Sequence, residues 1–500
     1  MKLHGLALVV VGACVADRAP NPVTPAWVTD TATFHPGPAP GASIADTYRE
    51  RAAKIVTAAR SDRGAYRKLA QLTDHIGHRL SGSPELDRAI AWAMQAMKDD
   101  GLEAHTEKIM VPHWVRGAED GELVTPITRP LHLLGLGGTV STPKAGITAP
   151  VVVVHDWVEL DAKRDAVKGA IVLYDVPMPT WTEQNQSGYG DVVQYRWAGA
   201  QRAAKLGAVA VLMRSITAHS LRTPHTGSLT YDDAIAKIPA AAVTVEDSTL
   251  ITRLAAAGPV SVHVHLESQM LPDAESANVI GELRGKDKPD EIVVIGGHID
   301  SWDVGQGAHD DGAGIVTMMQ TLALLKRMGL QPRRTIRAVL FTNEENGLRC
   351  GKGYAEQHAA ELPKTVFAIE SDSGGFSPRG FTLGTKDAAT SARVGPRLAD
   401  ILSLLRPLGA TNLRLEGKTG GADVGPMAPA GVPQAGLEVD NRTYFDIHHT
   451  DADTLDKVDP AQLADDVAAV AVVAYIIADL PDRLDAPDGG GIAAPVHDAP

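Results

Sequence analysis

Apolar positions recur at helical spacing near the start of the folded part of this chain. Over 84–99 they share one helix face, behind the start signal Ser83-Pro84 and ahead of Gly101. Residues three and four apart lie on one side of a helix, so this pattern predicts an amphipathic helix over 84–99. A second helix is expected directly before it, over 65–76.

The pattern then changes to short β-branched runs, separated by turn residues. Runs at 151–154, 170–174 and 209–213 and an alternating segment at 260–266 are typical of strands, with one short helix expected over 198–206. We therefore expect a mostly β domain over residues 136–272. It carries no cluster of acid–base or metal-ligand residues, so it is expected to have no chemistry of its own.

From about residue 276, strands alternate with helices. Strands are expected at 291–295, 335–341 and 365–369, with helices over 312–328 and 352–361 between them. This alternation predicts an α/β fold, a doubly wound and mostly parallel sheet with helices on both faces. The catalytic domain would comprise residues 44–135 and 273–484, with the β-rich segment inserted between them. The apolar helix at 465–479 is too short for a membrane span and is expected to pack on the sheet.

The N-terminus has the features of an export signal. Lys2 is followed by a short apolar run, and Val11-Gly-Ala-Cys14 is similar to a bacterial lipobox, whose cysteine becomes lipidated. An ordinary signal peptide cut near Ala13 or Ala16 is the alternative. We expect a signal over 1–16, a Pro-rich tether over 17–43 and a disordered tail over 485–500. The protein would be exported, as a periplasmic or outer-membrane lipoprotein or in secreted form.

Composition narrows the function classes. Apolar residues make up 44% and charged residues 22% of the 500 positions, close to the averages of globular proteins. Two cysteines exclude a disulfide framework and a cysteine-based zinc finger. The net charge is −14 and no lysine- or arginine-rich run is present, so nucleic acid and anionic membranes are poor partners. Membrane contact is expected only through a lipid on Cys14.

Residues that bind metals or transfer protons follow the predicted strands. In open α/β sheets, reactive groups gather beyond the carboxyl ends of the strands. The candidates at these positions are His298, Asp300, Asp310, Asp311, Glu344, Glu345, Asp372, His448, His449 and Asp453. Any one of these residues alone is weak evidence of a functional site, but their repetition at successive strand ends predicts one shared site.

The residue types suit a pair of metal ions. Two histidines, two aspartates and one glutamate fit zinc, with cobalt or manganese as substitutes. A two-metal site needs a bridging carboxylate, and Asp310 lies between two strand-end groups. The expected ligands are Asp310 with His298 and Asp372 for one ion, and Asp310 with Glu345 and His449 for the other.

The remaining acidic residues are given supporting roles. Glu344 is left free beside a ligand, where it can act as the general base. Asp300 is expected to hydrogen-bond the imidazole of His298, and Asp453 that of His449. The sequence has no G-x-S-x-G, P-loop or H-E-x-x-H motif, and the glycines at 135–138 lack the third position of a dinucleotide fingerprint.

Together these motifs resemble the co-catalytic zinc exopeptidases, the family of secreted bacterial leucyl aminopeptidases and glutamate carboxypeptidases. The segments that carry the resemblance are 297–302, 307–314, 344–345, 370–372 and 448–450. Within that family, the segments 79–83, 112–114, 224–227 and 297–307 are similar to the plasma glutamate carboxypeptidases. The resemblance covers roughly residues 60 to 482. His309 departs from it, since an apolar residue more often precedes the bridging aspartate.

The resemblance implies a zinc exopeptidase fold interrupted by a protease-associated insert, two Zn²⁺ per chain and a homodimer. It favours His449 over His448 as the ligand and leaves His448 as a candidate substrate-binding residue. The expected activity is hydrolysis of dipeptides or of C-terminal residues of small peptides, through a metal-activated water with Glu344 as general base. An aminopeptidase is the main alternative. A one-zinc glutaminyl cyclase and a non-catalytic receptor-like relative are disfavoured, because all five ligands and Glu344 are present.

Overall fold

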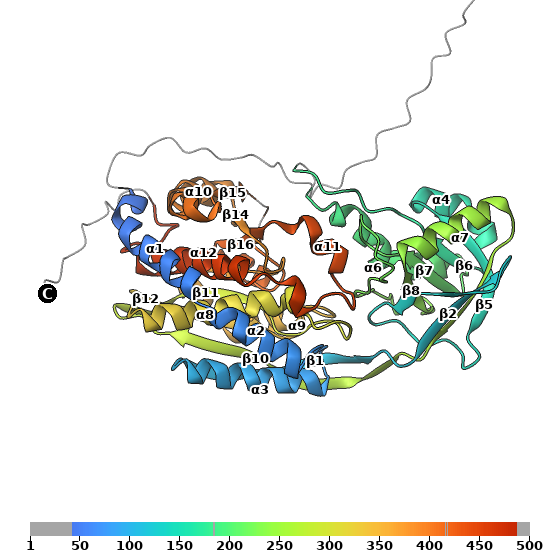
Figure 1. Ribbon diagram of the computed structural model, residues 1–500, viewed down its shortest axis with the longest axis horizontal. Helices are drawn as coiled ribbons and strands as arrows, with labels where there is room; N and C mark the ends of the chain where they lie inside the picture. Colours follow the sequence, from blue (N-terminus) through green and yellow to red (C-terminus); the bar gives the residue numbers. More distant parts are fainter. Residues whose placement is uncertain (1–42, 184–185, 416, 418, 488–500) are drawn as a thin grey trace, which may run out of the picture.

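The computed structural model describes residues 43–183, 186–415, 417 and 419–487. The expected signal and lipobox, residues 17–42 of the expected tether, and most of the expected tail lie outside these residues. The described chain forms two units that lie side by side, each built on its own sheet (Figure 1). Two long strands, β1 and β10, run from the larger unit toward the smaller one (Figure 1).

The larger unit is built on an eight-stranded sheet with the order β1-β10-β12-β11-β13-β16-β14-β15. Its central strands β12, β11, β13 and β16 are parallel, and antiparallel strands flank them. The strands are β1 (Glu103–Val115), β10 (Gln269–Leu283), β11 (Lys288–His298), β12 (Arg334–Phe341), β13 (Thr365–Glu370), β14 (Pro378–Leu383), β15 (Asn412–Leu415) and β16 (Gln434–Val439).

Both faces of this sheet are buried under helices. Along β11, Val293 and Ile295 enter one apolar core, while Ile292 and Val294 enter another on the opposite face. Successive strand residues point to opposite faces, so a continuous apolar run indicates burial on both. The helices of this unit are α1 (Ile44–Ser61), α2 (Gly64–His75), α3 (Pro84–Asp99), α8 (Gly314–Arg327), α9 (Arg349–Gln357), α10 (Ala388–Leu402), α11 (Tyr444–Ile447) and α12 (Pro460–Asp479). The predicted α/β fold with helices on both faces is confirmed.

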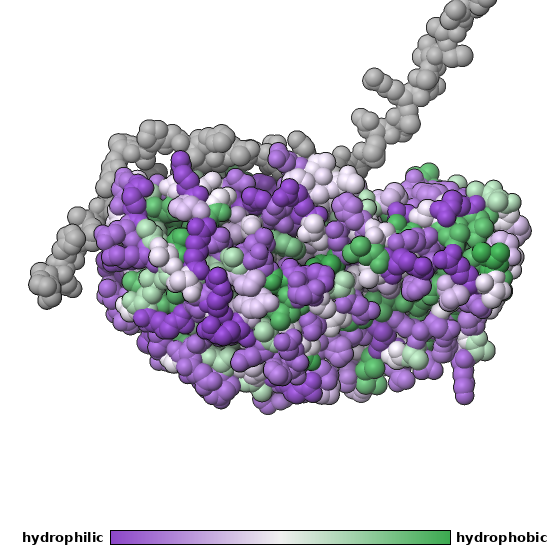
Figure 2. Space-filling view, in the orientation of Figure 1, coloured by the Kyte–Doolittle hydropathy of each residue, from purple (hydrophilic) through white to green (hydrophobic). Residues whose placement is uncertain are grey.

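Two helices predicted from spacing are found where expected. In α3, the Ser83 side chain accepts a hydrogen bond from the Leu86 backbone N–H at 3.2 Å, which caps the helix start. The apolar helix expected over 465–479 is α12, which already begins at Pro460, so the expectation that it is too short for a membrane span was wrong. Among the described residues, α12 is the one helix long and apolar enough to cross a membrane, and 83% of its most apolar window is buried inside the protein. It packs against α1 and α8, and the helices on the face shown in Figure 2 present mainly hydrophilic residues outward.

The smaller unit also has an eight-stranded sheet, with the order β3-β2-β9-β5-β6-β7-β8-β4. Its strands are β2 (Glu119–Thr125), β3 (Arg129–Leu131), β4 (Leu133–Gly135), β5 (Ile147–Val154), β6 (Ile171–Tyr174), β7 (Ala210–Arg214), β8 (Ala240–Val243) and β9 (Ser261–Leu266). Its helices are α4 (Trp157–Ala162), α5 (Arg164–Val167), α6 (Tyr189–Lys205) and α7 (Val245–Ala257).

This unit differs from the expected mostly β domain in two respects. It is itself α/β, since β5 to β8 are parallel and α6 and α7 are full helices. The Thr244 side chain accepts a hydrogen bond from the Asp247 backbone N–H and caps the start of α7. Threonine is a preferred residue at this position, so the sequence does carry a signal for the start of this helix. The sheet also begins at β2, before the expected boundary at residue 136, because β2 pairs with β9.

The two units meet at a small apolar cluster and an ion pair. Trp114 and Trp302 pack together with Leu80, and a Cβ at Gly137 would collide with the Trp302 ring. Beside them, Arg116 is paired with Asp303 at 2.6 Å. Strand β1 of the larger unit and the strands of the smaller one are thereby fixed against the loop that follows β11.

Arg79 pins that loop from inside the protein. The side chain is fully buried, and its guanidinium donates to the carbonyls of Ile299 at 2.6 Å, Gln306 at 2.8 Å and Gly307 at 2.9 Å. Burial lowers the pKa of Arg79. The loop leads directly into Asp310, so Arg79 sets the path of the backbone that presents this residue.

Replacing Arg79 by methionine removes these hydrogen bonds while keeping much of the volume. We expect Arg79→Met to lower the free energy of unfolding by about 3–5 kcal/mol, because several buried carbonyls lose a charged donor. Arg88→Met is the matched control, since Arg88 is exposed on α3 and its one ion pair among the described residues is with Glu85; it should cost less than about 0.5 kcal/mol. Urea unfolding followed by circular dichroism measures both. Equal effects of the two changes would contradict this role.

Candidate metal centre and active site

The five expected metal ligands come together at one edge of the larger sheet. The parallel strands β11, β12 and β13 end at this edge, and in open α/β sheets ligands bind beyond the carboxyl ends of the strands. The residues are His298 at the end of β11, Asp310 in the irregular turn before α8, Glu345 after β12, Asp372 after β13 and His449 after α11. All but Asp372 are at most 8% exposed.

The carboxylate of Asp310 lies between two pairs of ligands. Its Oδ1 is 3.2 Å from His298 Nε2, which is also 3.3 Å from Asp372 Oδ1. Its Oδ2 is 3.2 Å from His449 Nε2, which is 3.1 Å from Glu345 Oε2. One oxygen therefore faces each pair, as a bridging carboxylate requires.

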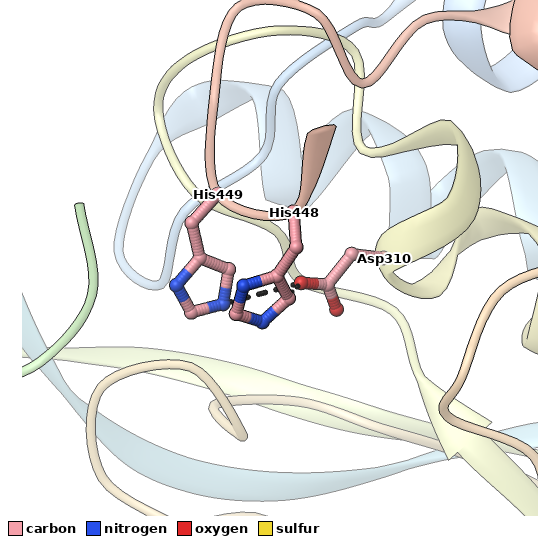
Figure 3. A group of neighbouring side chains, drawn as sticks. All are labelled: Asp310, His448 and His449. Atoms are coloured by element: carbon pink, nitrogen blue, oxygen red, sulfur yellow. Dashed lines mark ion pairs between the residues drawn. The ribbon is translucent and has the colours of Figure 1, made fainter. Parts of the chain in front are cut away.

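The chemistry of this cluster fits divalent cations. Asp310 Oδ2 and Glu345 Oε1 are buried and accept no hydrogen bond from any residue that the structure describes. A buried carboxylate oxygen without a donor is costly, and a bound cation would satisfy it. The ligand atoms of His298, Asp310 and Glu345 lie within 4.8 Å of one another, as do those of Asp310, His448 and His449 (Figure 3).

His298 is oriented by the backbone of Asp300. Its Nδ1 lies 3.1 Å from the Asp300 carbonyl oxygen and 3.6 Å from the carboxylate that was expected to bind it. A proton on Nδ1 leaves the Nε2 lone pair directed at Asp310 and Asp372. The Asp300 carboxylate instead accepts from the backbone N–H groups of Asn343 at 2.9 Å, Glu344 at 3.1 Å and Glu345 at 3.3 Å. Asp300 thus positions both His298 and the turn that carries the two glutamates.

His449 is oriented by the smaller unit. Its Nδ1 lies 3.2 Å from the carbonyl oxygen of Thr226, and the Thr226 N–H donates to the His449 carbonyl at 3.1 Å. Asp453 was expected in this role, and the structure contradicts that expectation. Its carboxylate accepts from the backbone N–H groups of His309 at 2.8 Å and Asp310 at 3.0 Å. Asp453 therefore holds the backbone of the central carboxylate, because the turn at Asp310 points its amides at Asp453.

The two neighbouring histidines have different environments. His448 stacks on His449, with ring centroids 3.5 Å apart, and its Nε2 is 3.5 Å from Asp310 Oδ2 (Figure 3). Burial and the adjacent His449 lower the pKa of His448. His309 stacks on Phe376 instead, and its Nδ1 accepts from the Gly375 N–H at 3.1 Å. Burial lowers the pKa of His309 to about 4, so it is a neutral packing residue.

Crowded carboxylates make this site strongly attractive to cations. Burial, together with Asp372 and Glu345, raises the pKa of Glu344 well above its usual range. Burial and Asp310 raise the pKa of Glu345 to about 7. Burial also acts to raise the pKa of Asp310, but the neighbouring His298 and His449 side chains outweigh it and hold that pKa well below the usual range. Divalent cations would relieve the repulsion among these acids.

No particular role is predicted for Asp311 from the sequence, yet its carboxylate supports the backbone of the site directly. Its Oδ2 accepts from the His298 backbone N–H at 3.0 Å and its Oδ1 from that of Gly314 at 3.1 Å. A Cβ at Gly297 or Gly314 would collide with the Asp311 carboxylate. The glycines next to His298 and after Asp311 are the feature of the sequence that could have indicated this role, since they leave room for the buried Asp311 carboxylate.

A cavity of about 520 Å³ opens beside the metal centre. The larger unit contributes the cluster of acids and histidines, and the smaller unit contributes Tyr189, Arg196 and Ser228. These residues of the smaller unit were also missed, because that unit was expected to have no part in the chemistry. The spacing of residues along one segment cannot show which distant segment faces it.

Comparison with known proteins agrees with this site. Residues 278–474 match the protein family described as "Peptidase family M28". Carboxypeptidase Q of Mus musculus is 40% identical over 422 residues, which cover 84% of this chain and 87% of that protein. The chain belongs to peptidase family M28 and is a zinc-dependent exopeptidase, as the resemblance implied.

Solved structures extend the comparison. A crystal structure of a peptidase M28 precursor from Shewanella amazonensis has a TM-score of 0.81 and 34% identity, and the match covers 90% of this chain and 100% of that one. A zinc aminopeptidase from Bacillus subtilis has a TM-score of 0.59 at 21% identity, covering 82% of this chain and 94% of that one. The second structure supports the fold alone.

Changing Asp453 tests how the backbone holds the central carboxylate. In Asp453→Asn, one of the two acceptors becomes an amide nitrogen that faces a backbone N–H. We expect zinc affinity to fall about 10–100-fold, because partners that orient ligands typically contribute that much. Zinc retained after dialysis against graded zinc buffers, measured by mass spectrometry, reports the affinity.

Asp451→Asn is the control, since Asp451 is exposed on the same loop. It should keep the wild-type affinity. If Asp453→Asn also retains it, the carboxylate is not needed to hold Asp310.

Proposed function

We propose that this chain is a two-zinc exopeptidase that hydrolyses dipeptides or removes C-terminal residues from small peptides. The observation that carries the proposal is the Asp310 carboxylate, whose two oxygens face separate ligand pairs. His298 and Asp372 would complete one zinc site, and Glu345 and His449 the other. Cobalt or manganese would suit the same donors. Zinc ions in these positions would polarise the scissile carbonyl and acidify a water molecule.

Glu344 is proposed as the general base. It lines the cavity beside Glu345, on the turn that the Asp300 carboxylate holds. Water adds to the carbonyl carbon while its proton passes to a Glu344 oxygen. The C–N bond then breaks, and the same proton passes to the leaving amine nitrogen. One carboxylate thus serves both proton transfers, and the enzyme returns to its starting state.

The carboxypeptidase or dipeptidase activity is favoured over an aminopeptidase by similarity to carboxypeptidase Q across most of the chain. An aminopeptidase would use the same ligands and base, so the metal centre does not separate the two. The smaller unit is proposed to be a protease-associated insert, and a homodimer is proposed from the family resemblance. Export, with a lipid on Cys14, is proposed from Lys2 and the apolar run that follows it.

Two neighbouring glutamates separate the proposed base from a proposed ligand. Glu344→Gln keeps the size of the side chain but cannot accept the proton. We expect kcat on unblocked dipeptides to fall at least ~10³-fold with little change in KM, and about two zinc ions to remain bound. Glu345→Gln should instead lose zinc along with activity.

The measurements are zinc content and kcat for both variants and the wild type. The assignment is reversed if Glu344→Gln loses its metal while Glu345→Gln keeps both ions and is merely slower. Activity of the wild type that survives exhaustive chelation would overturn the metal proposal itself.

A further inference from the structure

A further set of contacts joins the two units, besides those at Trp302 and His449. It connects three residues of the smaller unit with residues 441–446 of the larger one. We call this set the outer bridge, and its pairs are Trp181 with Asn441, Tyr189 with Phe445 and His219 with Asp446. In Figure 1, α11 reaches from the larger unit toward α6, well away from the long strands β1 and β10. The outer bridge therefore connects the units at a second place.

The pair of Trp181 and Asn441 is the part of the outer bridge that meets the cavity. The indole Nε1–H of Trp181 donates to Asn441 Oδ1 at 2.9 Å. Asn441 lines the cavity beside the metal centre and also a second cavity of about 320 Å³. Both cavities are also lined by Asp372 and Ser373. Asn441 therefore lies at the border that the two cavities share.

The smaller unit's side of this pair borders both cavities as well. Gln186 lines the second cavity and Ser187 the first. Gly188, which has a positive φ of 66°, precedes α6, and a Cβ there would lie 3.0 Å from the Pro179 ring. The residues just before Trp181 are thus packed against the start of α6, which limits where the Trp181 ring can lie.

Charged residues hold the larger unit's side of the pair. Asp440 precedes Asn441 in the chain. It is paired with Arg379 at 2.5 Å and with Arg442. The guanidinium carbon of Arg442 lies over the Trp181 ring, 5.9 Å from its centroid, and a cation is attracted to the face of an indole. The Trp181 ring therefore has a hydrogen-bond acceptor at its edge and a cation over its face.

Tyr189 and Phe445 extend the outer bridge toward the metal centre. Both rings line the first cavity, and they stack with their centroids 4.7 Å apart. The ring of His448 lies beside both, with its centroid 5.5 Å from that of Tyr189 and 5.0 Å from that of Phe445. His448 in turn stacks on the proposed ligand His449. The outer bridge thus reaches from Asn441 to the histidines of the metal centre.

The space bounded in this way suits a short peptide. The cavity beside the metal centre holds about 520 Å³ and the second cavity about 320 Å³. Pockets of about 300–1,000 Å³ hold ligands the size of a drug molecule, which is also the size of a dipeptide or tripeptide. Each further residue of an extended chain adds roughly 3.3 Å. A longer peptide therefore has to leave the cavities where the outer bridge joins their walls.

We propose that the outer bridge restricts the substrate to peptides of two or three residues. This inference rests on the proposed exopeptidase function, and it assigns the limit on substrate length to contacts between the two units. Trp181 is a positioning residue that acts through Asn441, because their hydrogen bond joins the units at the border of the two cavities. Without this bond, the walls on either side of the border should separate and admit longer peptides.

The test compares dialanine with penta-alanine, which differ in length and not in side chain, and free alanine is measured by mass spectrometry. We expect the wild type to favour dialanine by about 100-fold in kcat/KM. Trp181→Ala should raise kcat/KM for penta-alanine about tenfold and change that for dialanine by less than about threefold. Asn441→Ala should shift the ratio in the same direction. The double variant should add little, because both changes remove the same hydrogen bond.

Trp92→Ala is the matched control. The Trp92 side chain is partly exposed on α3, and its Nε1 donates to the Gln71 side chain at 3.4 Å, as Trp181 donates to Asn441. Since α3 packs on β1 and β10 of the larger unit, this variant should keep the wild-type preference for dialanine.

The outcomes separate this inference from the proposed function. A wild type that cleaves penta-alanine as well as dialanine overturns the inference and leaves the exopeptidase function intact. A wild type that prefers dialanine, with a Trp181→Ala variant that keeps the same preference, overturns the role of the outer bridge. Release of no alanine from either peptide contradicts the proposed function, and the inference falls with it. Zinc content is measured for every variant, and if Trp181→Ala has lost zinc, an unchanged ratio in Asn441→Ala overturns the proposal.

Discussion

One buried carboxylate has to face two ligand pairs at the same time, and the rest of the site is arranged around this requirement. The Asp310 oxygens each lie 3.2 Å from a different histidine. Such a geometry needs a fixed backbone. Asp453 fixes it by accepting hydrogen bonds from two backbone N–H groups, and Arg79 fixes the preceding loop by donating to its carbonyl groups. The parallel strands β11, β12 and β13 end together, so His298, Glu345 and Asp372 arrive at the same edge, and His449 reaches it from the end of α11.

The smaller unit contributes to the site, although none of the five proposed metal ligands lies in it. Its Thr226 carbonyl orients His449, and its Arg196 presents a positive charge to the cavity. The pairing of Arg116 with Asp303 fixes the two units against each other near the loop after β11. Residues of both units line the cavity beside the proposed metal centre, so a few contacts between the units determine its shape.

The sequence predicts the α/β fold, and it points to candidate residues that the structure brings together, because His298, Glu345 and Asp372 follow strands whose apolar runs are visible. His449 was also expected after a strand, but it follows the short helix α11. The sequence does not predict what orients these residues. Asp453 was assigned to His449, yet it binds the Asp310 backbone, and the partner of His449 is a carbonyl more than 200 residues away in the chain. Every residue has a backbone carbonyl, so composition and spacing cannot show which carbonyl will accept a hydrogen bond from a given histidine. The smaller unit was expected to be mostly β because short β-branched runs dominate its sequence pattern, and its boundary was misplaced because β2 pairs with the distant β9.

The central claim is that Asp310 bridges two zinc ions. Anomalous diffraction at the zinc edge, from crystals of the zinc-loaded protein, tests it most directly. If Asp310 bridges two zinc ions, two anomalous peaks are expected roughly 3.5–4 Å apart. Each should contact one oxygen of Asp310, with His298 at one peak and His449 at the other. A single fully occupied peak, or a second peak that does not touch Asp310, would contradict it.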